Sequence, residues 1–489
     1  MLTAHTVAQV RAAEEVAAAD AGWDELMQRA AAGLAQHVAR AVPATETLVV
    51  LVGPGNNGGD ALFAAAHLCR EGRRVNLCLL DEARAHPAGL AAAREAGAQV
   101  VDGPEGHRHV VDAIFGIGAR PGLEGTAAAW AEWIERERPF VIAVDVPSGI
   151  GVDDGRLDGP AIRADLTVTF ATAKHGLLLG PASALAGRVE VVDIGLDLSG
   201  QPALEALDAG DGARFREAIV PGHDSHKYTR GVLGVRAGSP QYAGAAHLCV
   251  AGAQAGPAGM IRFVGAQDLA RRVVDRAPEI VARRGRVQAW VVGSGGEDSP
   301  VPLASALRDE VPIVVDATAL HHLPQAFEVD ALLTPHAGEL AAVLGVDRVA
   351  VEADPLRHAR EAAERYTATV LLKGPRTLVV APDGRTRVNL SGTPWLGTAG
   401  AGDVLAGFIG SLLATGLDAF DAGSVGALLH GLAAERLRGP LVASDVARLL
   451  PSLLLDFCDA NRPTEADQDE SRHQSRRDRH ESREGGEAE

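Results

Sequence analysis

The stretch LVVLVGPGNNGGDALFAAAHL, residues 48–68, joins an apolar run to a glycine-rich loop and then to an alanine-rich segment. This order predicts a buried strand, a turn and a helix, which is the repeating unit of a parallel α/β fold. Gly53, Gly55 and Gly58 also spell G-x-G-x-x-G, the fingerprint of a dinucleotide-binding loop. Three interpretations are open: a plain tight turn, an ordinary pyrophosphate site, or a polar ligand pocket.

The polar residues of this loop favour the pocket. Asp60 falls in the first turn of the predicted helix, where a carboxylate suits the helix dipole but would repel a pyrophosphate. Asn56 and Asn57 supply amide oxygens that can bind a cation and N–H groups that can donate to a ligand. We therefore expect a polar ligand with a cation beside it.

Short apolar runs alternate with helical patterns along most of the chain, in two series separated by a segment without strand-like runs. The two series share no order of motifs, so we predict two different three-layer α/β/α domains rather than a duplication. Residues 1–42 show helical spacing, and APDG at 381–384 predicts a hairpin turn. The expected organisation is a first domain at 1–200, a connector at 201–224, a second domain at 225–459 and a disordered, charged tail at 460–489.

The composition excludes several classes of protein. The chain has 489 residues, of which 47% are hydrophobic and 22% charged, with a net charge of −18, which fits a soluble globular protein and disfavours a nucleic-acid partner. The four cysteines have no CxxC spacing, which argues against a zinc site or a disulfide framework. No signal peptide or membrane-spanning run is visible, so we expect a cytoplasmic protein with no membrane partner.

In two further segments of the first series, a predicted strand ends close to the same sheet edge. VVDAIFGIGARPGLEG places Asp112 within a strand and a glycine-rich loop, Gly116 to Gly122, after it. VIAVDVPSGI places Asp145 at a strand end and Ser148 in the following turn. Ligand sites of α/β folds lie at the carboxyl ends of strands, so we expect these segments to meet the 53–60 loop. Their oxygen donors, without His or Cys, favour an alkali or alkaline-earth ion.

GPGNNGGDALFAA, VVDAIFGIG and AVDVPSGI, in this order, resemble the NAD(P)H-hydrate epimerase domain, also called the YjeF N-terminal domain, over residues 1–200. The resemblance implies a Rossmann-like domain that interconverts the epimers of hydrated NADH or NADPH. It implies a catalytic role for Asp145, as base or as anchor, and a potassium ion on Asn57, Asp112 and Ser148. The implied substrate residues are Asn56, Asn57, Gly58, Gly59, Asp60, Gly116, Ile117, Gly118, Ala119, Arg120, Pro121, Gly122 and Asp145. Ala61 departs from the glycine frequent in the family, and its methyl group is expected to crowd the helix start.

TAGAGDVLAGFIGSLLATG, residues 398–416, carries the strongest chemical signal in the chain. Gly400, Gly402 and Asp403 precede an amphipathic helix, so backbone N–H groups and the positive helix end converge on one point, as needed to bind a transferring phosphoryl group. Asp403 is placed to orient or deprotonate a hydroxyl that attacks the phosphate. LLTPHAGELAAVLG and VLLKGPRTLVVAPDG place His336 and Lys373 at further strand ends.

GAGD resembles the ribokinase-like superfamily, and TPHxGE with LLKGxxT resembles its NAD(P)H-hydrate dehydratase branch, over residues 225–458. The resemblance implies that ADP phosphorylates the hydroxyl of the S hydrate and that phosphate is then eliminated, giving AMP, phosphate and NAD(P)H. We expect Mg²⁺ to accompany the phosphates. The implied nucleotide residues are Lys373, Gly374, Pro375, Arg376, Thr377 and Gly402, and the implied hydrate residues are Gly244, Ala245, Gly295, His336 and Asp403. Ser294, Thr393 and Trp395 depart from the family pattern.

Together these features predict a bifunctional repair enzyme with Asp145 and Asp403 as its catalytic residues. Its expected partners are NADH hydrate, NADPH hydrate and ADP, and we expect a homo-oligomer. Two alternatives come from other classes. One is a ribokinase-like small-molecule kinase fused to a Rossmann-like ligand-sensing domain, and the other is a regulatory protein whose glycine-rich loops only sense nucleotides.

Overall fold

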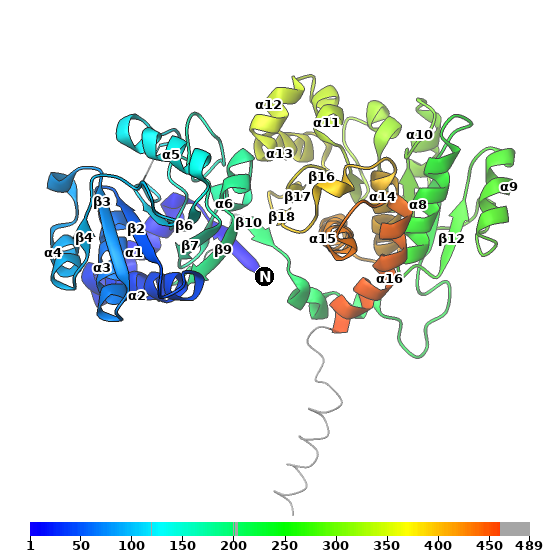
Figure 1. The fold of residues 1–489 in the computed structure, drawn as a ribbon. Coiled ribbons are helices and arrows are strands. Elements are labelled where there is room, and N and C mark those ends of the chain that lie inside the picture. The colour runs from blue at the N-terminus through cyan, green and yellow to red at the C-terminus, as the bar shows by residue number, and fades with distance from the viewer. Residues whose placement is uncertain (119, 199, 201–203, 460–489) are drawn as a thin grey trace, which may run out of the picture.

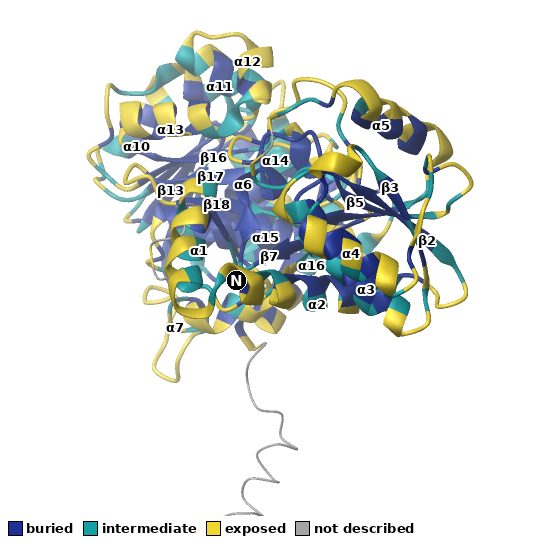
Figure 2. Ribbon diagram, turned by 90° about the vertical axis from the view of Figure 1, so that its left-hand side faces the viewer, coloured by how far each residue is buried: buried dark blue, intermediate teal, exposed yellow. Residues whose placement is uncertain are grey.

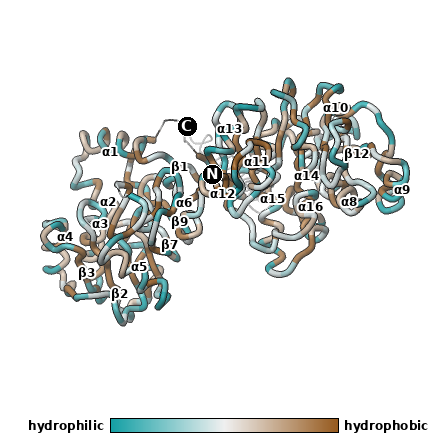
Figure 3. The backbone as a smooth tube through the Cα atoms, turned by 90° about the horizontal axis from the view of Figure 1, so that it is seen from above, coloured by the Kyte–Doolittle hydropathy of each residue, from teal (hydrophilic) through white to brown (hydrophobic). Residues whose placement is uncertain are grey.

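The computed structural model describes residues 1–118, 120–198, 200 and 204–459, and it forms two α/β halves that lie side by side (Figure 1). The predicted charged tail at 460–489 and the predicted substrate residue Ala119 lie outside the described residues. Apolar stretches run through the interior of both halves (Figure 3). No helix in the described ranges is long and apolar enough to cross a membrane.

Seven parallel strands form the sheet of the first half, in the order β4-β3-β2-β5-β6-β7-β9, among the described residues. The buried strands are nearly continuous apolar runs because helices cover both faces of the sheet (Figure 2). α2, α3 and α4 pack against one face, and α5 packs against the other. The bounds are β2 (Thr47–Val52), β3 (Arg74–Leu79), β4 (Gln99–Val100), β5 (His109–Ala113), β6 (Phe140–Val144), β7 (Leu166–Phe170), β9 (Arg188–Val192), α1 (Val7–Ala21), α2 (Trp23–Ala41), α3 (Asn56–Arg70), α4 (Pro87–Glu95) and α5 (Gly125–Glu137).

This strand order predicts where a ligand-binding crevice lies. The chain leaves β2 for β3 on one side and later returns to β5 on the other, so the order of the sheet reverses between β2 and β5. In doubly wound sheets the binding site lies at the carboxyl ends of the strands beside such a reversal. The 53–60 loop and the loop after β5 both start there.

The second half is built on a longer sheet, in the order β12-β11-β13-β14-β15-β16-β17-β18-β10-β1-β8 among the described residues. β11 to β16 are parallel, and β16, β17 and β18 pair antiparallel, which confirms the hairpin predicted at 381–384. The strand bounds are β11 (Val232–Arg236), β12 (Met260–Phe263), β13 (Ala289–Val292), β14 (Ile313–Val315), β15 (Ala331–Leu333), β16 (Thr369–Leu372), β17 (Thr377–Val380) and β18 (Thr386–Asn389).

Helices cover both faces of this sheet. One face carries α8 (Ala243–Ala255), α9 (Gln267–Arg276), α14 (Ala401–Leu413), α15 (Ala419–Leu437) and α16 (Ala443–Asp459). The other face carries α10 (Val301–Leu307), α11 (Ala337–Leu344), α12 (Arg348–Ala353) and α13 (Pro355–Tyr366). The three-layer architecture predicted for both series is confirmed.

Three short strands from the first part of the chain extend the second sheet, which was not expected. β1 (Leu2–His5) pairs with β10 (Leu204–Ala206) and with β8 (Ala173–Lys174), and β10 pairs with β18. Residues 2–5 were predicted to be helical and residues 204–206 to form no strand, and both predictions are wrong. Strands of three or four residues carry little periodicity, and their partners lie far away in sequence. The remaining short helices are α6 (His175–Leu178) and α7 (Arg216–Ile219).

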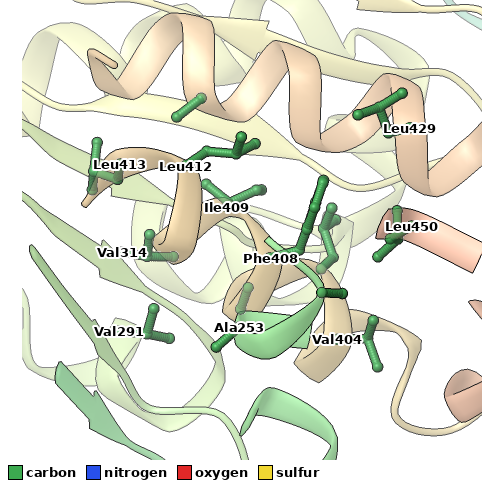
Figure 4. Packing of buried hydrophobic residues seen from close by; sticks show 14 of the residues in the cluster. Ala253, Val291, Val314, Val404, Phe408, Ile409, Leu412, Leu413, Leu429 and Leu450 are labelled. Carbon is green, nitrogen blue, oxygen red and sulfur yellow. The ribbon is translucent and has the colours of Figure 1, made fainter. Parts of the chain in front are cut away.

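The core of the second half centres on α14. Phe408 and Ile409 of α14 lie among side chains of α8, α15 and α16, and Val291 and Val314 of the sheet lie beneath them (Figure 4). Glycines let α14 and α8 approach closely. A Cβ atom on Gly407 would lie 1.9 Å from the carbonyl oxygen of Cys249. Since α14 carries the GAGD residues, this contact fixes the second candidate site.

We expect Gly407→Ala to lower the free energy of unfolding by about 1–3 kcal/mol, because the added methyl group meets a backbone oxygen that cannot rotate away. Gly439→Ala is the matched control, since a Cβ atom there meets nothing within 4 Å. Urea unfolding of the two variants measures the difference. Equal stability of both would contradict the close packing of α14 on α8.

Candidate active sites

The first candidate site is a cavity of about 480 Å³ at the carboxyl ends of β2, β5 and β6. The predicted substrate residues that line it are Asn56, Asn57, Asp60, Gly116, Ile117, Gly118 and Asp145. Arg11 and Glu14 of α1, with Phe170 and Lys174, also line the cavity, and none of these was predicted from the sequence. Segments that are far apart in the chain therefore meet at the reversal of the sheet.

The other predicted substrate residues of this half that the structure describes lie outside the cavity wall. Gly58 is buried in the first turn of α3, where a Cβ atom would lie 2.3 Å from the carbonyl oxygen of Gly53. Gly122 donates its N–H to the carbonyl oxygen of Gly149 (2.9 Å). Gly59 is buried, Arg120 is exposed and Pro121 is partly exposed. Ala61 packs into the core between α3 and the sheet, so its methyl group stays out of the cavity.

The three residues predicted to bind potassium lie together beside this cavity. Ser148 Oγ donates to Asp112 Oδ1 (2.7 Å), and Ser148 N donates to Asp112 Oδ2 (2.8 Å). Asn57 Oδ1 lies close to Gly116, and Asn57 Nδ2 is buried and has no hydrogen-bond partner among the described residues. Burial raises the pKa of Asp112 to about 6, against the hydrogen bonds from Ser148 and Ile114, which lower it. A buried carboxylate that forms no ion pair within the described chain fits a site that takes up a cation.

Asp145 forms an ion pair with Lys174 in the wall of the cavity. It follows β6 with a φ of 66°, in the left-handed region that non-glycine residues rarely occupy. Its Oδ1 accepts from Lys174 Nζ (2.5 Å) and from Thr169 Oγ1 (3.1 Å). Burial and then the carboxylates of Asp145 and Glu14 raise the pKa of Asp60 well above its usual value. The cavity thus holds several carboxyl groups around one amine.

The second candidate site surrounds the start of α14. Gly400, with a φ of 89°, caps the helix, and Asp403 follows in its first turn. A Cβ atom on Gly402 would lie 3.4 Å from Lys373 Nζ, so the amine lies next to the positive end of the helix. Burial and then the carboxylate of Asp316 raise the pKa of Asp403 to about 6, while Lys373 lowers it. An amine, the N–H groups of a helix start and a carboxyl group therefore meet at one point, as phosphoryl transfer requires.

Asp316, at the carboxyl end of β14, fixes Lys373 and was missed from the sequence. Lys373 Nζ donates to Asp316 Oδ1 (3.1 Å), as does Thr334 Oγ1 (2.8 Å), and Ser294 Oγ donates to Asp316 Oδ2 (2.8 Å). Burial lowers the pKa of Lys373, but the carboxylates of Asp316, Glu339 and Asp403 together raise it above the usual value. Ser294, a departure from the family pattern, thus holds the aspartate that orients the lysine.

The remaining predicted residues of the second half lie around the same sheet edge. Lys373 N donates to the carbonyl oxygen of Pro335 (2.8 Å), which brings His336 beside the LLKG segment. His336 caps α11, because its Nδ1 accepts from Glu339 N (3.0 Å). A Cβ atom on Gly295 would lie 2.3 Å from the Cβ of Ala245, so these two segments are in contact.

The rest of this set lies at the surface or on a neighbouring loop. A Cβ atom on Gly244 would meet no other atom within 4 Å among the described residues. Arg376 donates to the carbonyl oxygen of Leu390 (2.7 Å), and Thr377 begins β17. Gly374 and Pro375 are exposed. Thr393 caps the turn that carries Trp395, whose side chain is exposed.

Both candidate sites are lined by glycines and lie at the carboxyl ends of parallel strands, and one of them has a lysine and a carboxyl group at a helix start. These features define a two-domain α/β enzyme. Comparison with known proteins gives the family. Residues 23–176 match the family model described as the YjeF-related protein N-terminus, and residues 233–452 match the model described as NAD(P)H-hydrate dehydratase. This chain belongs to the family of bifunctional NAD(P)H-hydrate repair enzymes.

The relatives match over nearly their whole length. The bifunctional NAD(P)H-hydrate repair enzyme Nnr of Mycobacterium tuberculosis is 40% identical over 447 residues, which cover 86% of this chain and 90% of that protein. The enzyme of the same name from Mycobacterium leprae is 40% identical over 457 residues, covering 88% and 93%. The ADP/ATP-dependent NAD(P)H-hydrate dehydratase of Bacillus subtilis, crystallised with ATP and Mg²⁺, is 26% identical, covers 50% of this chain and 96% of its own, and has a TM-score of 0.47.

Proposed function

We propose that this chain repairs hydrated NADH and NADPH in two steps. The first domain interconverts the R and S epimers, and the second dehydrates the S epimer with ADP. The observation that carries the proposal is the meeting of Asp403, Lys373 and the start of α14 in a chain whose other half holds the Asp145 cavity. Water adds to either face of the nicotinamide ring, so a dehydratase specific for one epimer would leave the other unrepaired.

The residues of the second site account for the dehydration. Asp403 accepts the proton of the hydrate hydroxyl as its oxygen attacks the terminal phosphorus of ADP and AMP leaves. Lys373 and the N–H groups of α14 stabilise the charge on the transferring phosphoryl group. The C6–O bond then breaks as C5 loses a proton, which gives the ring double bond and inorganic phosphate. Phosphate leaves far more readily than hydroxide, and Mg²⁺ bound with the phosphates would supply further charge neutralisation.

In the first site, Asn57, Asp112 and Ser148 would hold potassium, whose charge would help to bind an anionic nucleotide. Asp145 contacts the hydrate as base or as anchor. We also infer a cytoplasmic location and a homo-oligomer, and we keep the domain limits at 200 and 225 as part of the proposal. A kinase fused to a sensor, the first alternative, would phosphorylate an alcohol without recovering NAD(P)H.

The assay that tests the function incubates the purified protein with mixed hydrate epimers and ADP, ATP or neither. We expect complete recovery of NADH with ADP and no recovery without a nucleotide. A phosphorylated alcohol that accumulates while NADH is not recovered would support the kinase instead.

Dehydration should depend on pH through Asp403. Its raised pKa of about 6 means that the carboxyl group is protonated below that value and cannot accept the hydroxyl proton. We therefore expect kcat for the S hydrate to rise about tenfold per pH unit up to about 6 and then to level off. The measurement is kcat between pH 4.5 and 8, with circular dichroism to show that the protein stays folded. A flat profile would remove Asp403 from the role of base.

Potassium should stabilise the folded chain, because it binds only where Asn57, Asp112 and Ser148 come together. At about 100 times its Kd the ion would add about 2.7 kcal/mol to the free energy of unfolding. The readout is Tm in potassium chloride against lithium chloride at equal ionic strength. We expect Ser148→Ala to lose the difference and Ser183→Ala, another buried serine, to keep it. Equal Tm in both salts for the unaltered protein would argue against the ion site.

A further inference from the structure

Lysine is very rare in this chain, and its few positions are informative. Of the 46 lysine and arginine residues only three are lysines, Lys174, Lys227 and Lys373. Lys373 lies at the second candidate site and Lys174 at the first. A compact amine fits where a planar guanidinium does not, so a chain that otherwise uses arginine keeps lysine where that shape is needed.

Every donor of the Lys174 amine is already used. Its Nζ donates to Asp145 Oδ1 (2.5 Å), Thr169 Oγ1 (2.9 Å) and the carbonyl oxygen of Phe170 (2.9 Å). The side chain is 1% exposed. A lysine ammonium has three N–H groups, so none is left to contact a ligand. Lys373 differs, because a single hydrogen bond, to Asp316, is found for its amine within the described chain.

The two oxygens of Asp145 are not equivalent. Lys174 Nζ, Thr169 Oγ1 and the N–H of Phe170 all donate to Oδ1. In the part of the chain that the structure describes, no group donates to Oδ2, although the residue lines the cavity. The φ of 66° at Asp145 turns its backbone out of the course of β6. The carboxylate is therefore held from one side, and its other oxygen is available to a ligand.

The backbone that carries Lys174 is fixed as well. Lys174 lies on β8, where it pairs with His5 of β1, and both strands belong to the sheet of the second half. A side chain on a paired strand is held more firmly than one on a free loop.

We propose that Lys174 is the positioning residue of the first site. It holds Asp145 through Oδ1 and leaves Oδ2 as the single acceptor that the aspartate presents to the hydrate. The inference rests on the proposed epimerase function and goes beyond it, because it assigns one oxygen of Asp145 to the substrate and gives a role to a lysine that does not touch the substrate.

The test compares kinetic constants for conversion of R to S hydrate in the unaltered protein and in Lys174→Met. We expect kcat to fall about 100-fold, the loss that follows when a catalytic group is displaced by about 1 Å. KM should change by less than about threefold, because the amine makes no substrate contact. Dehydration of the S hydrate by Lys174→Met should be unchanged, and this unchanged rate would show that the variant is folded. An unchanged kcat, or a rise in KM alone, would overturn the proposal.

A double variant separates positioning from an independent role. If Lys174 acts only through Asp145, Lys174→Met should cause no further loss in an Asp145→Asn background. Additive losses would overturn the proposal. If the unaltered protein does not convert R to S hydrate at all, the proposed function itself fails, which is a different result from these.

If Lys174→Met does not fold, Thr169→Val provides a second test of the proposal. It removes one donor from Asp145 Oδ1 and should lower kcat by about tenfold with KM unchanged. Thr167→Val is its matched control, since Thr167 is buried on the same strand but donates to the carbonyl oxygen of Ala186. Equal kcat values in the two threonine variants would count against the positioning of Asp145.

Discussion

Asp403→Asn should lower kcat for dehydration of the S hydrate about 1,000-fold while epimerisation continues at the unaltered rate. The substitution keeps the shape of the side chain in the first turn of α14 but replaces the carboxylate by an amide, which is not basic enough to accept the hydroxyl proton. Loss of a general base typically costs 10²–10⁴-fold in rate. The effect on KM should be small, because Lys373 and the helix N–H groups still bind the phosphates.

The measurement is the ADP-dependent appearance of NADH from pure S hydrate. Asp418→Asn is the matched control, because Asp418 caps the neighbouring helix α15 and asparagine caps a helix equally well. We expect full activity in that variant. Wild-type activity in Asp403→Asn would mean that another group takes the proton.

Asp145→Asn should slow recovery of NADH from R hydrate to the spontaneous rate of epimerisation, with recovery from S hydrate unchanged. The amide cannot accept at both positions as the carboxylate does, and it removes the negative partner of Lys174, whose amine is buried. The two epimers therefore separate the sites in one experiment.

Asp165→Asn is a suitable control for this variant, because Asp165 accepts from Val141 N at the opposite end of the same sheet. Both epimers should be recovered normally in that variant. If Asp145→Asn slowed both epimers equally, the division of labour between the domains would be wrong.

Much of the fold was predictable because long elements carry their own signals. The 48–68 stretch predicted β2 and α3, and the run around GAGD predicted α14, since apolar periodicity and glycine-rich turns are local properties of the sequence. β1, β8 and β10 were missed because they are very short and are stabilised by partners far away in the chain.

Prediction of the candidate sites has the same limit: contacts between distant parts of the chain cannot be predicted from local sequence. Asp145 and Asp403 were predicted from the turns that carry them. Asp145 lines the first cavity, and Asp403 lies in the first turn of α14, where burial raises its pKa. Lys174 and Asp316 were missed, because their significance lies in contacts that join separate strands. The scarcity of lysine was the one sequence signal that pointed to Lys174. Ser294, which departs from the family pattern, donates a hydrogen bond to Asp316.

The most direct test of the two-step repair gives the unaltered protein pure R hydrate, first without a nucleotide and then with ADP, and follows both epimers and NADH by chromatography. We predict that S hydrate appears without a nucleotide and without NADH, and that NADH appears only after ADP is added. Formation of NADH from R hydrate without prior appearance of S hydrate, or no conversion of R hydrate before ADP is added, would contradict the account.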